Sequence, residues 1–217
     1  MDAVTEQLFR SIRSDVPHGG LSWDNYWEIV HMARDIYGPW TVNCHTLVGL
    51  GESDHDLMTI FEDLLERQIF SYLFCFKPEP DSNMAEHPRT PVQRWRRIQL
   101  AKFLLEEEGL DPSAFDYDAD GMLRQVRAPE DLVHRVVADG HAFMTNGCPG
   151  PKGEPGCTRP MGSWRPGEEP RDYPWRPAAP DAAEILAQLD LPVFLRPGPG
   201  PTRPPELRAQ PAAGRVG

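Results

Sequence analysis

The sequence predicts an α/β fold in which βα units of a parallel sheet are followed by an irregular Pro/Gly-rich carboxyl-terminal extension. Two short apolar segments, 42–48 and 71–76, have the length and residue types of buried strands. Each leads through a turn into an amphipathic helical pattern, and this strand–helix–strand–helix order is typical of parallel sheets with right-handed crossovers. Beyond residue 147 the chain is rich in Pro, Gly and Arg, which predicts irregular structure.

Two helices are expected before the first strand. Apolar residues recur at helical spacing over 2–13, and the Pro-Gly segment 17–20 ends that pattern. Ser22 is a typical N-cap for a second helix, whose apolar positions continue to Ile36 and whose expected stop is Gly38.

The first strand is expected to divide its side chains between two faces, because successive side chains of a strand point to opposite sides. One face carries Asn43, His45 and Leu47. The other face carries Val42, Cys44, Thr46 and Val48.

Capping signals place a helix after each strand. Ser53 and Asp56 form a capping box ahead of an apolar stripe. After the second strand, Thr90 is the expected N-cap and Pro91 the first-turn proline of a helix that stops at Gly109.

The acidic segment 116–121 resembles the start of a calcium loop. Arg127 stands where that loop needs a bidentate Glu, so an ordinary turn is the better interpretation. Two short helices are predicted further on, over 129–137 and 182–189.

These patterns divide the chain into four parts. Residues 1–110 carry the βα units, 111–145 form a helical connector, and 146–194 form an extension that contains cysteines. The tail, 195–217, is expected to be disordered, because it has too few apolar side chains to bury.

Composition restricts the partners and the compartment. A net charge of −11 argues against nucleic acid or an anionic membrane as a partner, and the basic segment 94–97 is expected to be a solvated or phosphate-facing side of its helix. No segment approaches the ~20 apolar residues of a membrane span. The amino terminus lacks a signal-peptide pattern, so a cytoplasmic location is expected, where four cysteines are thiols or metal ligands.

The turn at Gly49–Glu52 is the first candidate site. Ligands of parallel βα folds lie at the carboxyl ends of strands, and glycine lets the backbone approach a ligand closely. A tight turn that needs glycine only for its geometry is an equally weighted interpretation.

The segments 45–53 and 74–84 resemble the late strands of the radical S-adenosylmethionine (radical SAM) barrel. Many members carry a Gly-x-Ile-x-Gly-x-x-Glu pattern, to which Leu47, Gly49 and Glu52 conform while His45 replaces the first glycine. The Pro-Glu-Pro-Asp-Ser-Asn-Met turn at 78–84 is similar to the turn after the next strand in biotin-synthase-like and lipoyl-synthase-like members.

This resemblance implies one half of a parallel βα barrel and SAM-dependent radical chemistry such as sulfur insertion. The residues it assigns to the SAM pocket are Leu47, Gly49, Gly51, Glu52 and Phe74. Asn43 and His45 would face a small-molecule or protein-bound substrate, with a cavity-lining role favoured over metal ligation; a hydrogen-bonded core histidine is the alternative. No catalytic residue is assigned.

Cys148 and Cys157 form the second candidate site. They lie in a Gly/Pro-rich loop of the kind that wraps iron–sulfur clusters or zinc. The loop also resembles the Cys-Pro-Gly…Cys-Asn-Arg-Pro extension of some lipoate-synthesis-like proteins, with Thr158 in place of Asn. Two thiolates are fewer than a full cluster site requires, so an auxiliary metal here is a hypothesis. Cys44 and Cys75 are expected to be buried packing residues.

The cluster motif of the family is missing from the sequence. Radical SAM enzymes hold a [4Fe–4S] cluster by three cysteines spaced Cys-x3-Cys-x2-Cys, whereas no two cysteines here are closer than nine positions. SAM and the cluster are therefore implied only for a complete protein. A longer gene product, a partner chain that supplies the other half-barrel, or a decayed gene would explain the gap. The alternative function is a non-catalytic metal-binding or scaffold protein that completes another chain's barrel.

Overall fold

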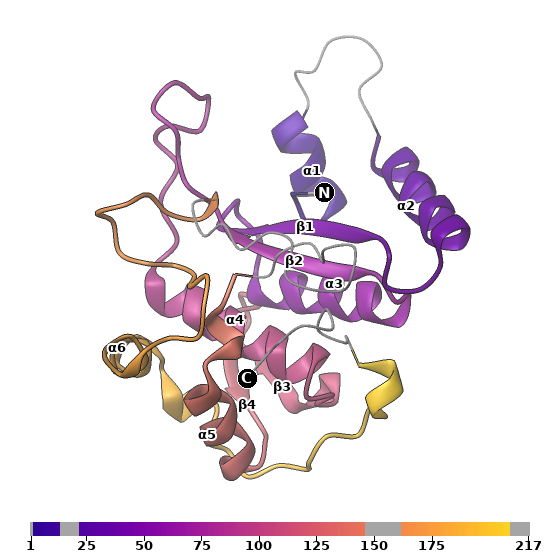
Figure 1. Ribbon diagram of the computed structural model, residues 1–217. Helices are drawn as coiled ribbons and strands as arrows, with labels where there is room; N and C mark the ends of the chain where they lie inside the picture. The colour runs from indigo at the N-terminus through magenta and orange to yellow at the C-terminus, as the bar shows by residue number, and fades with distance from the viewer. Residues whose placement is uncertain (1, 14–21, 146–161, 209–217) are drawn as a thin grey trace.

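The computed structural model describes residues 2–13, 22–145 and 162–208 as a mixed α/β structure (Figure 1). Its elements are α1 (Glu6–Arg13), α2 (Trp23–Tyr37), β1 (Asn43–Val48), α3 (Asp54–Glu66), β2 (Phe70–Cys75), α4 (Val92–Glu106), β3 (Phe115–Tyr117), β4 (Leu123–Val126), α5 (Glu130–Asp139) and α6 (Ala179–Gln188). Short 3₁₀ turns connect several of them. Within the described ranges, no helix has both the length and the apolar character needed to cross a membrane.

β1 and β2 form a parallel pair, as the sequence predicts. The register runs from Asn43 opposite Phe70 to Val48 opposite Cys75. No barrel closes: the described residues contain this two-stranded parallel sheet and a separate two-stranded antiparallel sheet. The expected half-barrel is therefore present only as one parallel pair with its helices.

Helices cover the face of β1 that carries Cys44, Thr46 and Val48, all of which are buried. The core on this side includes Phe61 of α3 and Trp95 of α4, both with no exposed surface. α2 joins the same core through Val30, and lies beside β1, far from α5 and α6 (Figure 1).

Local capping signals give the expected boundaries for two helices. The Ser22 side chain accepts a hydrogen bond from the backbone of Asn25, and Ser53 and Asp56 form the predicted capping box. The prediction for Thr90 is wrong: its hydroxyl donates to the Val48 carbonyl oxygen at 3.2 Å, so it ties α4 to β1 instead of capping the helix.

The predicted helical connector contains a β-hairpin that the sequence pattern missed. β3 and β4 pair antiparallel, and the acidic segment 116–121 provides the turn between them. Asp118 fixes this turn by accepting hydrogen bonds from the backbone N–H groups of Asp120 and Met122. The strands have only three and four residues, too few for a periodic signal. The helix after them, α5, agrees with the prediction for 129–137.

The expectation of a disordered tail is wrong for residues 195–208. Ala128 donates its N–H to the Arg196 carbonyl oxygen, and Thr202 donates to Gly109, each at 3.0 Å. Gly109 lies so close to this segment that a Cβ would be 2.6 Å from Arg208 Nε. The tail needs no core of its own, because its backbone hydrogen-bonds to the body of the protein.

Candidate functional site

The turn after β1 is organised by the carboxylate of Glu52. This carboxylate accepts hydrogen bonds from the N–H groups of Gly49, Leu50 and Gly51 at 2.7, 2.8 and 3.1 Å. Arg94 Nη2 from α4 also binds it, at 3.0 Å. The Glu52 side chain has no exposed surface, so its charge is used inside the turn, where charge-assisted hydrogen bonds are strong.

The need for glycine at position 49 follows from close packing. Its φ of +108° is unfavourable for other residues, and a Cβ would lie 1.9 Å from the Thr90 hydroxyl oxygen. Its carbonyl oxygen is hydrogen-bonded to His87 Nε2 at 2.7 Å. The turn was expected either to contact a ligand or to need glycine only for its geometry. Geometry accounts for Gly49, because the side chain of Thr90 fills the space next to its Cα.

The face of the parallel sheet opposite Cys44 and Val48, called here the His45 face, brings the remaining predicted residues together; on it Tyr72 is buried and Gly162 lies against the Phe74 ring. Asn43, His45 and Leu47 of β1 lie opposite Phe70, Tyr72 and Phe74 of β2 in the strand register. The His45 ring is exposed, with centroids 5.1 Å from Phe74 and 6.0 Å from Tyr72. Partial desolvation lowers the pKa of His45, which favours the neutral imidazole. Neutral imidazole can both donate and accept a hydrogen bond.

The basic segment 94–97 does not form a solvated side of its helix. Arg94 binds Glu52 and also Asp54, the latter at 2.8 Å. Arg96 has no exposed surface and donates to the carbonyl oxygens of Pro170 and Arg171 at 2.8 and 2.7 Å. Burial lowers the pKa of the Arg96 guanidinium, but these acceptors satisfy its N–H groups.

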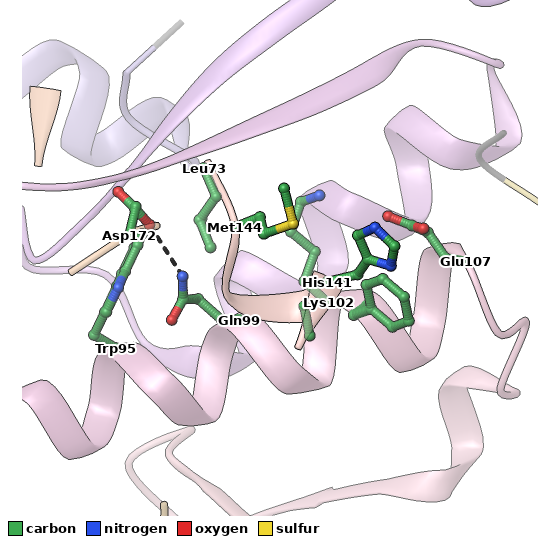
Figure 2. A pocket seen from close by; sticks show the side chains of 10 residues that line it. Leu73, Trp95, Gln99, Lys102, Glu107, His141, Met144 and Asp172 are labelled. Carbon is green, nitrogen blue, oxygen red and sulfur yellow. Dashed lines mark hydrogen bonds between the residues drawn. The ribbon is translucent and has the colours of Figure 1, made fainter. Parts of the chain in front are cut away.

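A buried acid beside β2 is a feature that the sequence analysis missed. Asp172 is fully enclosed, and its carboxylate accepts a hydrogen bond from Gln99 Nε2 at 3.0 Å (Figure 2). Burial raises the pKa of Asp172 to about 7, although Ser163, Arg96 and Arg171 act in the opposite direction. No periodicity marks this residue, because it lies in an irregular Pro-rich segment.

A cavity of about 20 Å³ adjoins this acid, lined by α4 and the segment that includes His141 and Met144 (Figure 2). A water molecule needs roughly 10–15 Å³ of such space. The enclosed space therefore has room for about one water molecule.

The described cysteines do not fit an iron–sulfur cluster. Cys44 and Cys75 are fully buried, as expected, and lie on the helix-covered side of different strands. Burial raises the pKa of both thiols, that of Cys75 to about 11, so both remain protonated. Across residues 2–13, 22–145 and 162–208, no group of three His, Cys, Asp or Glu side chains could hold a metal. Cys148 and Cys157 lie outside the described residues.

The predicted SAM residues thus separate into two sets. Gly49, Gly51 and Glu52 form the closed turn, while Leu47 and Phe74 share the His45 face of the sheet with Asn43 and His45. No protein-family model, curated protein or solved structure matches this chain.

Proposed function

We propose that this chain is the later half of a radical SAM-type barrel and that the His45 face of its parallel sheet contacts the adenosine part of SAM. The observation that supports this most is the grouping of His45, Leu47 and Phe74 on the face opposite the helices. Aromatic and apolar side chains stack on a nucleobase with about 1–3 kcal/mol per base. Asn43 and His45 add hydrogen-bonding groups on the same face.

The chain would need another half-barrel for this chemistry, because its sequence has no Cys-x3-Cys-x2-Cys motif to bind the cluster. In the family, the cluster bound to SAM supplies the electron that generates a 5′-deoxyadenosyl radical. The residues of this chain would bind and orient the adenosine, and Glu52 would hold the turn beside it in shape.

The apolar surface of α2, the helix before β1, supports the idea that a second half-barrel completes this one. Ile29, Met32 and Ile36 repeat at positions i, i+3 and i+7 along α2, and they are 55, 54 and 68 % exposed. At the outer edge of β1, the Leu47 N–H donates to the Asp2 carbonyl oxygen. Within the described residues, no strand pairs with this edge. A preceding strand added at this edge would lie under α2 and cover its apolar stripe.

The same stripe favours a second candidate function, a non-catalytic scaffold that completes another chain's barrel. The two candidates differ in whether this chain itself contacts adenosine.

Saturation-transfer NMR with S-adenosylhomocysteine tests the proposal on the full chain. Saturation should reach the adenine protons, and Phe74→Ala should weaken the binding that produces this signal at least about fivefold through lost stacking. Leu186→Ala, at an exposed position on α6, is the matched control and should leave the signal unchanged. Absence of adenine saturation in the folded wild type, or equal signals in both variants, would overturn the adenosine proposal and favour the scaffold.

A further inference from the structure

We propose that Arg171 and Arg89 bind a phosphate group, as the free ion or a phosphomonoester, at the carboxyl end of β2. Arg171 is only 5 % exposed. Its Nε and Nη1 atoms have no hydrogen-bond partner within the described residues, and its Nη2 reaches the Glu169 carboxylate only at 3.6 Å. A buried guanidinium with unpaired N–H groups is strongly unfavourable unless an acceptor joins it.

Arg89 provides a second unpaired donor in the same region. Its Nε atom is buried and, in the described part of the chain, has no partner, although its Nη2 donates to Glu168 at 3.0 Å. Arg89 lies just before α4, and the Arg171 carbonyl oxygen accepts hydrogen bonds from the side chains of Trp95 and Arg96 in the first turns of that helix, so both arginines lie near its amino-terminal end. Glu168 and Glu169, which they approach, are neighbours in the chain.

The nearby carboxylates are already engaged. Glu168 accepts hydrogen bonds from Lys77 Nζ at 2.6 Å and from the Arg165 backbone at 2.9 Å, besides that of Arg89. These contacts, led by the one to Lys77, lower the pKa of Glu168 to about 2. The carboxylate of Asp172 is directed to Gln99. No described carboxylate therefore lies within hydrogen-bond distance of Arg171.

The donors favour a phosphate group over a carboxylate. Arg89, Arg171 and Lys77 carry three positive charges against the two carboxylates of Glu168 and Glu169, and guanidinium groups match phosphate oxygens with several N–H donors each. A phosphate dianion would satisfy both guanidinium groups at once. The site lies on the Cys75 side of β2 and does not depend on the adenosine proposal, which concerns the opposite face of the sheet.

Thermal unfolding of the full chain with inorganic phosphate tests this inference, with chloride added to hold ionic strength constant. Phosphate should raise the melting temperature with a saturable dependence on concentration. Arg171→Met should weaken the apparent affinity about tenfold, as expected for loss of a charged hydrogen bond. Arg10→Met removes an arginine of α1 whose side chain is 74 % exposed, and it should leave the response unchanged.

Arg89→Gln provides a second variant if Arg171→Met does not fold. The Arg89 side chain is partly exposed, so this variant should fold, and it should also weaken the response to phosphate. Glycerol phosphate distinguishes a phosphomonoester ligand from the free ion. A larger rise in melting temperature than with inorganic phosphate indicates a phosphomonoester, and an equal rise indicates the free ion. No saturable response in the wild type, or a response that neither arginine variant weakens, would overturn the proposal.

Discussion

Replacing Asp172 by Asn should stabilise the protein at neutral and alkaline pH but not at acidic pH. The folded pKa of this carboxyl is about 7, compared with 3.8 for an unperturbed Asp, because burial disfavours its ionised form. Each pKa unit corresponds to about 1.4 kcal/mol, so full ionisation costs the folded state up to about 4 kcal/mol.

The direction of the pH dependence follows from proton binding. Between pH 4 and 7 the folded state retains a proton that the unfolded state has released, so this group lowers the free energy of unfolding as the pH rises through that window. Below pH 4 both states are protonated, and the group has no effect. Above pH 7 the full cost is present.

Asn resembles the protonated acid and can still accept the hydrogen bond from Gln99. Its extra N–H must find an acceptor, so the expected gain at pH 8 is about 1–4 kcal/mol, falling to zero near pH 4. Urea denaturation followed by tryptophan fluorescence, from pH 4 to 8.5 in chloride without phosphate, measures this difference. Asp35→Asn, at a side chain that is 81 % exposed, is the control. If wild type and Asp172→Asn show parallel pH dependence, the reasoning is refuted.

Three further predictions concern the turn and the core. Gly49→Ala should lower the free energy of unfolding by more than about 2 kcal/mol, because the residue has positive φ and its Cβ would clash with Thr90. Gly38→Ala, where φ is +93° and no atom lies within 4 Å of the new Cβ, should lower it by about 1 kcal/mol. Equal losses for the two variants in urea denaturation would contradict this. Glu52→Gln should lower the free energy of unfolding by about 3 kcal/mol in the same assay, because a donor NH2 group replaces one of the two carboxylate oxygens that accept the backbone N–H groups of the turn; a loss under about 1 kcal/mol would contradict this. Cys75 should be alkylated by iodoacetamide at pH 8 only when urea unfolds the chain, as mapped by mass spectrometry; modification in the folded state would contradict its burial.

The local elements were predictable because their signals lie within a few residues. Ser22 and Ser53 cap their helices as the sequence indicates, and the parallel pairing follows from two apolar segments separated by a helix. The β3–β4 hairpin and the packing of the tail were not predictable in this way. Their hydrogen bonds depend on partners distant in sequence, such as Thr202 with Gly109.

The candidate site was predictable only as far as alternation along a strand allows. Alternation places Asn43, His45 and Leu47 on one face, and the structure agrees. It gives no information on the environment of Arg96, whose acceptors lie 74 and 75 residues further along the chain. Four adjacent residues with three arginines therefore look like a surface patch, although all three arginines bind buried partners.

The two edges of the parallel sheet differ, and this difference determines where a further strand could pair. At the β2 edge, Ser163 accepts a hydrogen bond from the Cys75 N–H at 3.1 Å, and Met144 and Asp172 line a cavity together with Leu73. The segment that supplies these residues is anchored to α4 through buried Arg96, so displacing it would expose an unpaired guanidinium. Among the described residues, no strand pairs with the outer edge of β1, where the Leu47 N–H donates to the Asp2 carbonyl oxygen of the amino-terminal segment. Under the proposed function, a completing half-barrel would join at this edge in place of the Asp2 contact, because the earlier strands of a parallel barrel would arrive from that side.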